Sequence, residues 1–436
     1  MAGSKNALII IILGLFIPLC SGADNWPEWR GPFQNGSTDA KGLPSHWGKE
    51  ENMVWVRPMP GPGSSTPIIC NGRVFVTSTQ KDSTDLLALC FEEATGKELW
   101  RKKMSVAQRR VPLNEMASPS PVTDGKYVYF LFGSGELVVV DYEGKVIWTR
   151  NLEAEYGNIA IQFGYSSSPI LYKDKLYITI LRREKAYKPP LSDKPLDSFF
   201  MALEPQTGKT IWKQVQRIDV EDESKESYAT PVIFEDGARA ELLMTGGDHI
   251  TSHDPETGKE LWRFEHTTEK GDDHRIVPSL LTGDGLIFGT RFKHGGLFAL
   301  KEVRNGTQIK AEYAWEFEGP APDCSTPLLY DGLLYVLDGI RKGGVISCLD
   351  PKTGRLYWQG KLKGRAPWRA SLTGADGKLY GINEKSEAVV LAAGREKFHI
   401  LFRYNFDEKP TRSSIAAVNG KIFVRTAKHL YCIGSK

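Results

Sequence analysis

One short unit recurs along this chain of 436 residues, and it constrains the fold more than any other feature. The unit is a tight turn in which Gly precedes Lys or Arg, followed by a Trp four residues after the Gly. Its clearest copy is Asp-Pro-Glu-Thr-Gly-Lys-Glu-Leu-Trp at residues 254–262. A fixed period of this kind predicts a repeat architecture. The repeated Trp, counting one degenerate copy and one strand without its own turn, occupies positions Trp55, Trp100, Trp148, Trp212, Trp262, Trp315 and Trp358.

Each repeat begins at a short segment rich in Ser and Thr and then contains four short apolar stretches. Eight such starts occur between residues 65 and 413, and a period of about fifty residues is typical of propeller blades with their loops. Asn-Gly and Asp-Gly turns between the stretches indicate antiparallel hairpins. The last repeat has only three strands, and the strand around Trp55 supplies the fourth. The sequence therefore predicts an all-β, eight-bladed β-propeller of four-stranded antiparallel blades over residues 52–436, whose last blade is closed by an N-terminal strand.

The N-terminus has the pattern of a secretory signal peptide at residues 1–23. Lys5 precedes an apolar run at residues 7–19, and Ser-Gly-Ala at 21–23 fits a cleavage site. The run is too short to favour a membrane-spanning helix. A lipid anchor at Cys20 and an uncleaved anchor are the alternatives. We therefore expect a periplasmic or secreted mature chain with no membrane span, which begins with an ordered, Trp-containing leader at residues 24–51.

Charge and cysteine content exclude several classes of function. The 56 Lys and Arg residues nearly balance the 53 Asp and Glu residues, and they are scattered along the chain, so no nucleic-acid partner is expected. The cysteines of the mature chain do not form CxxC patterns, which argues against zinc, thioredoxin-like and haem sites. We expect them to be small buried apolar residues rather than a disulfide framework. They are Cys70, Cys90, Cys324, Cys348 and Cys432.

The alternation of strand direction predicts which face of the propeller carries function. Connections between the second and third strands, and from blade to blade, must lie on the same face. They vary in length at residues 104–117, 182–198 and 266–276, whereas the turns on the opposite face are short. Variable loops on a rigid scaffold usually carry function. We therefore expect a protein partner or an extracellular ligand to bind on the variable-loop face.

Charged residues just before the innermost strands, together with one Trp, are the candidates for ligand binding at the mouth of the central channel. Guanidinium groups there could hold an anion or a carboxylate, and a structural Arg–Asp network is an equal alternative. The acidic residues and the imidazole at 272–274 could hold a cation, but a solvated loop is the favoured interpretation, so no metal site is predicted. The candidate residues are Asp272, Asp273, His274, Arg275, Asp323, Trp368, Arg369 and Arg412.

The repeated Trp and its Gly are expected to be structural. A large aromatic side chain at a fixed place in the outer strand suits packing beside the turn of the neighbouring blade, and the Gly suits a turn that requires positive φ. The sequence contains no nucleophile elbow, phosphate-binding Gly loop or HExxH pattern. No catalytic residue is therefore predicted.

The repeated unit, best preserved at residues 203–212, 253–262 and 349–358, resembles that of the PQQ-binding-like (quinoprotein-like) β-propeller repeat proteins of secreted bacterial type. One branch, the quinoprotein alcohol dehydrogenases, implies pyrroloquinoline quinone and calcium on the axis, an adjacent-cysteine disulfide and an Asp base; this sequence has no adjacent cysteines. The other branch, the propeller subunit of the bacterial outer-membrane barrel-assembly machinery, implies non-catalytic binding of proteins.

Two functional hypotheses follow. The favoured one is an exported, non-catalytic propeller that serves as a scaffold or binding module for a protein or an extracellular ligand, without a cofactor. The alternative is a quinoprotein dehydrogenase, an alcohol oxidoreductase dependent on PQQ and calcium. Its ligands would have to converge from among Asp272, Asp273, Asp323, Arg369 and Arg412.

Overall fold

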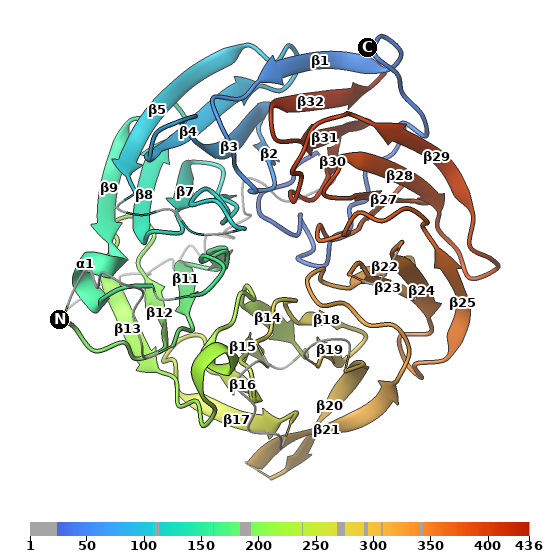
Figure 1. Cartoon of the computed structure of the whole chain (residues 1–436). Coiled ribbons are helices and arrows are strands. Elements are labelled where there is room, and N and C mark those ends of the chain that lie inside the picture. The colour runs from blue at the N-terminus through green and yellow to red at the C-terminus, as the bar shows by residue number, and fades with distance from the viewer. Residues whose placement is uncertain are drawn as a thin grey trace, which may run out of the picture.

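The computed structural model describes residues 24–107, 109, 111, 113–159, 161–183, 193–237, 239–267, 275–291, 295–306, 308–340 and 343–435. Within these residues the chain forms eight four-stranded antiparallel sheets arranged in a ring (Figure 1). The predicted all-β, eight-bladed propeller is thereby confirmed. Besides the strands there are a short helix, α1 (Leu152–Tyr156), and a 3₁₀ turn at Asp222–Lys225.

Seven blades are built from consecutive strands, which follow one another from the innermost strand outward. Blades one to four are β2 (Ile68–Cys70), β3 (Arg73–Thr79), β4 (Asp85–Glu92) and β5 (Glu98–Val106); β6 (Val122–Thr123), β7 (Tyr127–Leu131), β8 (Glu136–Asp141) and β9 (Val146–Asn151); β10 (Ile170–Tyr172), β11 (Lys175–Ile180), β12 (Phe199–Leu203) and β13 (Thr210–Val215); and β14 (Val232–Glu235), β15 (Ala240–Thr245), β16 (His249–His253) and β17 (Glu260–Glu265). Blades five to seven are β18 (Leu281–Gly283), β19 (Leu286–Thr290), β20 (Leu297–Asn305) and β21 (Gln308–Phe317); β22 (Leu328–Tyr330), β23 (Leu333–Asp338), β24 (Val345–Leu349) and β25 (Leu356–Lys361); and β26 (Thr373–Ala375), β27 (Lys378–Ile382), β28 (Glu387–Ala392) and β29 (Ile400–Asn405).

The eighth blade joins the two ends of the chain. Its inner strands are β30 (Ala416–Val418), β31 (Lys421–Arg425) and β32 (His429–Gly434), and its outer strand is β1 (Met53–Pro58). β1 pairs antiparallel with β32, with Trp55 opposite Cys432 and Pro58 opposite His429. Figure 1 shows β1 beside β32 at the rim of the ring. This confirms the predicted closure, which leaves β32 with a paired edge.

The repeated Trp residues join each blade to the next. Six of the seven indole N–H groups donate to a backbone carbonyl in the turn before the outer strand of the following blade, at 2.8–3.0 Å. At one such turn, Gly258 has a φ of 74°, and an added Cβ would lie 2.6 Å from a ring atom of Trp212. The turn therefore requires Gly both for its backbone conformation and for the space that the indole occupies. These contacts agree with the structural role expected for the repeated Trp and its Gly.

Trp262 departs from this pattern at the junction of blades four and five. Its N–H donates to Glu241 Oε2 at 2.9 Å and to Glu302 Oε1 at 2.7 Å instead of to a carbonyl. Trp262 is 5% exposed and Glu241 is 1% exposed. Burial, followed by the hydrogen bond with Glu241 and the charge of that carboxylate, raises the pKa of Glu302. At this junction the indole N–H therefore donates to a pair of buried carboxyl groups, whereas at the other junctions it donates to a carbonyl of a turn.

A second set of inter-blade contacts forms a closed ring around the axis. At the start of each blade, the backbone N–H of one Ser or Thr donates to the side-chain oxygen of its counterpart in the next blade, at 2.8–3.2 Å. A buried N–H group needs such an acceptor, and a short hydroxyl side chain supplies it. These are the Ser and Thr residues that mark the repeat starts in the sequence. The ring runs through Thr66, Ser120, Ser168, Thr230, Ser279, Thr326, Ser371 and Ser414, and returns to Thr66.

The leader crosses the central channel. Trp26 forms an antiparallel bridge with Ile69 in blade one, and Ser37 forms a parallel bridge with Gly374 in blade seven. Between them, the Arg30 guanidinium donates to the carbonyls of Asn35 at 2.7 Å and of Pro327 at 2.8 Å, and burial lowers the pKa of Arg30 to about 9. The leader is therefore fixed to blades one, six and seven.

Four of the described cysteines are free thiols. Cys90, Cys324, Cys348 and Cys432 are free, and three of them are buried as expected. Cys70 is disulfide-bonded, which corrects its interpretation as a free buried thiol. Spacing along a sequence does not show which sulfur atoms meet in space.

The sequence predicts no membrane span in the mature chain. In the described part of the chain, no helix has the length and apolarity to cross a membrane.

Candidate functional site

A cavity of about 400 Å³ lies on the propeller axis. Its walls come mainly from the connections that lead from the outermost strand of one blade to the innermost strand of the next, and all eight blades contribute. These connections share the face that the sequence predicted to carry function. Trp29 of the leader also lines the cavity. We call this cavity the axial cup.

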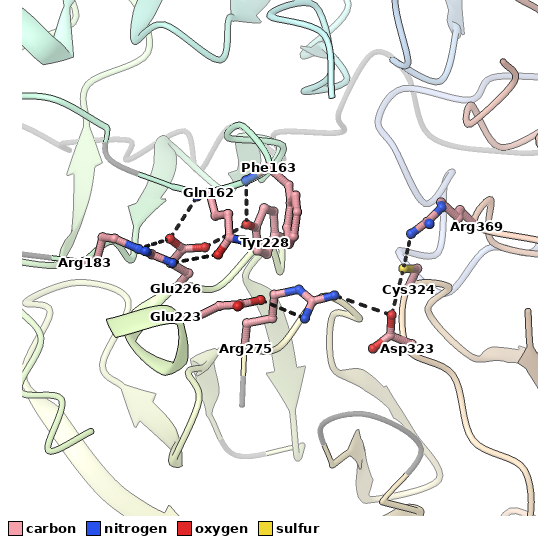
Figure 2. A network of polar contacts seen from close by, with 10 residues as sticks. All are labelled: Gln162, Phe163, Arg183, Glu223, Glu226, Tyr228, Arg275, Asp323, Cys324 and Arg369. Atoms are coloured by element: carbon pink, nitrogen blue, oxygen red, sulfur yellow. Dashed lines mark hydrogen bonds and ion pairs between the residues drawn. The ribbon is translucent and has the colours of Figure 1, made fainter. Parts of the chain in front are cut away.

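Arg275 projects from the start of blade five into the cup wall (Figure 2). Its Nη1 forms an ion pair with Glu223 at 2.9 Å, and its Nη2 lies 3.7 Å from Asp323 Oδ2. The guanidinium carbon lies 5.0 Å from the centre of the Phe163 ring. A stacked guanidinium with a carboxylate partner is held in one orientation, so Arg275 presents its charge to the cup from a fixed position.

Asp323, Cys324 and Arg369 form the facing part of the wall (Figure 2). Arg369 Nη1 donates to Cys324 Sγ at 3.4 Å, and the Cys324 thiol donates to Asp323 Oδ2 at 3.5 Å. Burial, reinforced by the charge of Asp323, raises the pKa of Cys324 to about 12. The thiolate is the nucleophilic form of cysteine, and this thiol stays protonated at neutral pH. Cys324 therefore acts as a weak hydrogen-bonding group in the wall.

Arg369 and Arg412 share one carboxylate. Glu384 Oε1 lies 3.0 Å from Arg369 Nε and 2.6 Å from Arg412 Nε, and Arg412 also donates to the carbonyl of Leu113. Both arginines line the cup, whereas Glu384 lies outside the lining. The two guanidiniums, which belong to adjacent blades, are consequently fixed from behind by one side chain.

A buried network braces the wall on the other side of Arg275. Glu226 is wholly buried and pairs with Arg183, and it accepts hydrogen bonds from Tyr228 Oη at 2.8 Å and from the backbone N–H of Gln162 at 2.9 Å. The Phe163 N–H in turn donates to Tyr228 Oη at 3.1 Å. Figure 2 shows these groups beside Arg275. The network fixes the ring of Phe163, on which Arg275 stacks.

The structure brings together part of the predicted set of ligand-binding residues. Arg275, Asp323, Arg369 and Arg412 all line the cup. Trp368 does not, because its side chain is wholly buried against blades six and seven, where added Cβ atoms at Gly344 and Gly381 would touch it. Within the alternating pattern of a chain entering a strand, Trp368 and Arg369 point to opposite sides. The remaining predicted residues, Asp272, Asp273 and His274, lie outside the described residues.

Several residues of the site could not be found from the repeat pattern. Trp29 comes from the leader, whose Trp-Arg-Gly-Pro sequence has no strand or helix period. Glu223 and Glu384 lie in connections of irregular sequence, and only the folded ring shows that they support arginines far away in the chain. The sequence signal available was the charged blade-start positions themselves, and these identified the arginines but not their partners.

The described lining is rich in hydrogen-bond donors and lacks an acid–base pair. Among its described residues, three arginines face one carboxylate, Asp323, and no His lines the cup. In the part of the chain that the structure describes, no group of three or more His, Cys, Asp or Glu side chains is arranged to hold a metal ion. Calcium prefers six to eight oxygen ligands, so a positively charged wall with one arginine-paired carboxylate does not fit that ion. The chemistry of this lining fits an anion.

Comparison with solved structures confirms the fold. A europium-containing methanol dehydrogenase superposes with a TM-score of 0.71 at 11% identity, covering 96% of this chain and 99% of that one. The quinohemoprotein alcohol dehydrogenase of Comamonas testosteroni gives 0.66 at 12% identity, covering 94% and 80%. BamB from Moraxella catarrhalis gives 0.61 at 13% identity, covering 88% and 99%. Dehydrogenases and BamB therefore share this architecture, and at these identities the likeness concerns the fold alone.

Sequence comparison places the chain in a family. Among curated proteins, no sequence matches it significantly. The family model described as outer membrane protein assembly factor BamB matches residues 47–182 and 246–393, which together make up more than half of the chain. The matched segments contain most of the Trp-bearing turns that join the blades. The chain therefore belongs to the PQQ_2 propeller-repeat family, whose model bears the description outer membrane protein assembly factor BamB.

Proposed function

We propose that this protein is an exported, non-catalytic propeller that binds a ligand or a protein segment in its axial cup. The observation that carries the proposal is the lining of the cup. Its arginines are fixed by the carboxylates of Glu223 and Glu384, which lie outside the lining. Its thiol has a raised pKa, and its described residues offer no nucleophile beside a general base. Such a surface is suited to hold a molecule rather than to transform it.

Two further features support this proposal. Residues 1–23 have the signal-peptide pattern, and the family model is described by an outer membrane assembly factor, so we infer that the protein works outside the cytoplasm, in the periplasm or secreted. The cup also lies on the face with the variable connections, where a partner has access to both the loops and the axial arginines.

The second candidate function is a quinone- and calcium-dependent alcohol oxidoreductase. The resemblance in fold to alcohol and methanol dehydrogenases motivates it. The described lining supplies guanidiniums that suit an anionic quinone, but Asp323 is the one carboxylate there, and it faces Arg275. The carboxylates Asp272 and Asp273, on which calcium binding would depend, lie outside the described residues.

One experiment separates the two functions. Purified, folded protein is incubated with pyrroloquinoline quinone and calcium, and both quinone binding and dye-linked oxidation of short alcohols are measured. We expect no turnover with any alcohol, whether or not the quinone binds weakly to the arginines. Stoichiometric quinone binding with calcium-dependent turnover would contradict the non-catalytic function and establish the oxidoreductase.

A further inference from the structure

The charge of the axial cup is positive on the side that faces its interior. Arg275, Arg369 and Arg412 line it, and the carboxylates that balance two of their charges, Glu223 and Glu384, lie behind the wall. Glu223 and Glu384 lie outside the lining, and Asp323 is the one carboxylate among the described lining residues, so guanidiniums outnumber carboxylates on the cavity side. A low-dielectric, concave site with this arrangement attracts an anion more strongly than the same arginines would on an open surface.

The arginines also keep hydrogen-bonding capacity for a ligand. Arg275 Nε is buried and has no hydrogen-bond partner among the described residues, and the 3.7 Å separation from Asp323 is longer than a hydrogen bond. Arg369 Nη1 donates to a thiol sulfur at 3.4 Å, and sulfur is a weak acceptor. A carboxylate oxygen is a stronger acceptor for the same donor. A carboxylate ligand would therefore form a stronger hydrogen bond with Arg369 than the Cys324 sulfur does.

The Ser and Thr residues that join the blades around the axis add hydroxyl donors to the cup. Thr66, Ser120, Ser168 and Thr230 belong to the ring and also line the cup. Each of these hydroxyl oxygens accepts a backbone N–H from the neighbouring blade, and within the described part of the chain none donates to a protein acceptor. A hydroxyl whose oxygen already accepts one bond still has its proton to give. The cup therefore presents neutral O–H donors as well as guanidiniums.

The size and the lining of the cup limit the ligand. A volume of about 400 Å³ is near the lower end of the range of about 300–1,000 Å³ that small-molecule sites occupy. Trp29, Leu113, Val277 and Ile340 supply apolar surface in the lining. A ligand that fits has one strongly accepting head and a compact body with some apolar surface.

We propose that the cup binds a small organic carboxylate, with the carboxylate group on the cavity side of Arg275 and Arg369 and the body toward Trp29. This assignment rests on the proposed binding function and names the chemical class of its ligand. Asp323, whose charge is offset by Arg275, is left to accept a hydroxyl or amide proton from the body of the ligand. A sugar acid has both a carboxylate and hydroxyl groups. The corresponding neutral sugar has the hydroxyl groups but no carboxylate.

The test is a calorimetric titration of the full-length mature protein at low ionic strength with glucuronate, glucose and inorganic sulfate. We expect glucuronate to bind with one site per chain, more tightly than sulfate, and glucose to show no binding. Arg369→Lys keeps the positive charge and loses the planar fork of donors. It should weaken glucuronate binding by about 10- to 100-fold, the range for losing a hydrogen bond to a charged group.

Two further variants keep the result interpretable. Arg395→Gln removes an arginine that is 69% exposed in the outer turn of blade seven, and it should leave binding unchanged. The double variant Arg275→Gln with Glu223→Gln removes both members of the closer ion pair, so that Glu223 is not left as an unpaired carboxylate. It should abolish binding in protein whose melting temperature shows it to be folded.

Three results would overturn the carboxylate assignment: sulfate binding without glucuronate binding, equal binding of glucose and glucuronate, or no loss of affinity in Arg369→Lys. The proposed non-catalytic function is tested separately, by the assay for quinone-dependent alcohol oxidation. A failure of the ligand class is therefore distinguishable from a failure of the proposed non-catalytic function.

Discussion

Trp262 shows at the scale of one residue how the repeat adapts to its surroundings. The six other repeated Trp residues donate to a turn carbonyl, whereas Trp262 donates to Glu241 and Glu302. The hairpin of blade five is long, with β20 and β21 paired from Leu297–Phe317 to Asn305–Gln308. Its turn therefore lies farther along the blade, and the carboxylate of Glu302 meets the indole instead.

Truncating Trp262 tests the energetic role of this joint. We expect Trp262→Ala to lower the free energy of unfolding by about 3–5 kcal/mol, since it removes a buried aromatic ring and the donor for two buried carboxylates. Chemical denaturation measures the change. Leu356→Ala is the control, because Leu356 is 43% exposed on an outer strand and should change stability by about 0.5 kcal/mol or less. A loss in Trp262→Ala as small as that of the control would refute the buried joint.

The carboxyl pair at the same junction predicts a dependence of stability on pH. The folded protein holds the proton of Glu302 more tightly than the unfolded chain does, because its pKa is raised by burial and by Glu241. This contribution to stability is complete below the unfolded carboxyl pKa of about 4.3, and it is lost as pH rises through the higher folded value. Glu302→Gln keeps an acceptor for Trp262 without a charge. It should therefore gain stability relative to the wild type as pH rises from about 5 to about 8.

Thermal melting of both proteins across this pH range provides the measurement. Glu396→Gln serves as the reference, since it makes the same chemical change at a side chain that is 86% exposed. Parallel pH profiles for wild type and Glu302→Gln would contradict a raised pKa of Glu302 in the folded protein.

At the scale of elements, the strand β1 and the leader have separate roles. β1 covers the edge of β32, and the leader covers the channel. Deleting residues 24–60 removes both, whereas deleting residues 24–51 removes the leader and keeps β1. We expect both variants to melt at lower temperature, because each loses the buried Trp26 and Trp47. Only the longer deletion should aggregate, since it alone exposes the backbone groups of β32. Sedimentation velocity that finds the two variants equally monomeric would refute the closing role of β1.

The elements that repeat are those that the sequence could predict. Eight repeat starts, the Gly-Lys turns and the unpaired Trp55 strand specified the blades and their closure, because each is a local pattern with a fixed spacing. The leader could not be placed in the channel, because its contacts with Pro327 and Gly374 join segments hundreds of residues apart. The four arginine and aspartate positions at the cup were predictable from their places before inner strands. The carboxylates that hold these arginines, Glu223 and Glu384, lie in connections of irregular sequence, where no repeat pattern indicates their positions.

At the scale of the whole molecule, two sets of hydrogen bonds join neighbouring blades of the propeller. The Trp contacts tie the blades near the rim, and the Ser/Thr hydrogen bonds tie them at the axis. The leader contacts blades one, six and seven, and its Trp29 lines the axial cup. Repeating residues thus hold the ring together, and residues that do not repeat give the cup its charge.

The most direct test of the anion-binding cup is a crystal structure of the protein soaked in bromide at low concentration, with anomalous difference maps to locate the ions. Bromide reports the positive sites that a small anion can enter, independently of any natural ligand. We predict the strongest peak in the axial cup, on the cavity side of Arg275 and Arg369. Strong peaks at exposed lysines and arginines with none in the cup would contradict the claim that the cup is an anion-binding site.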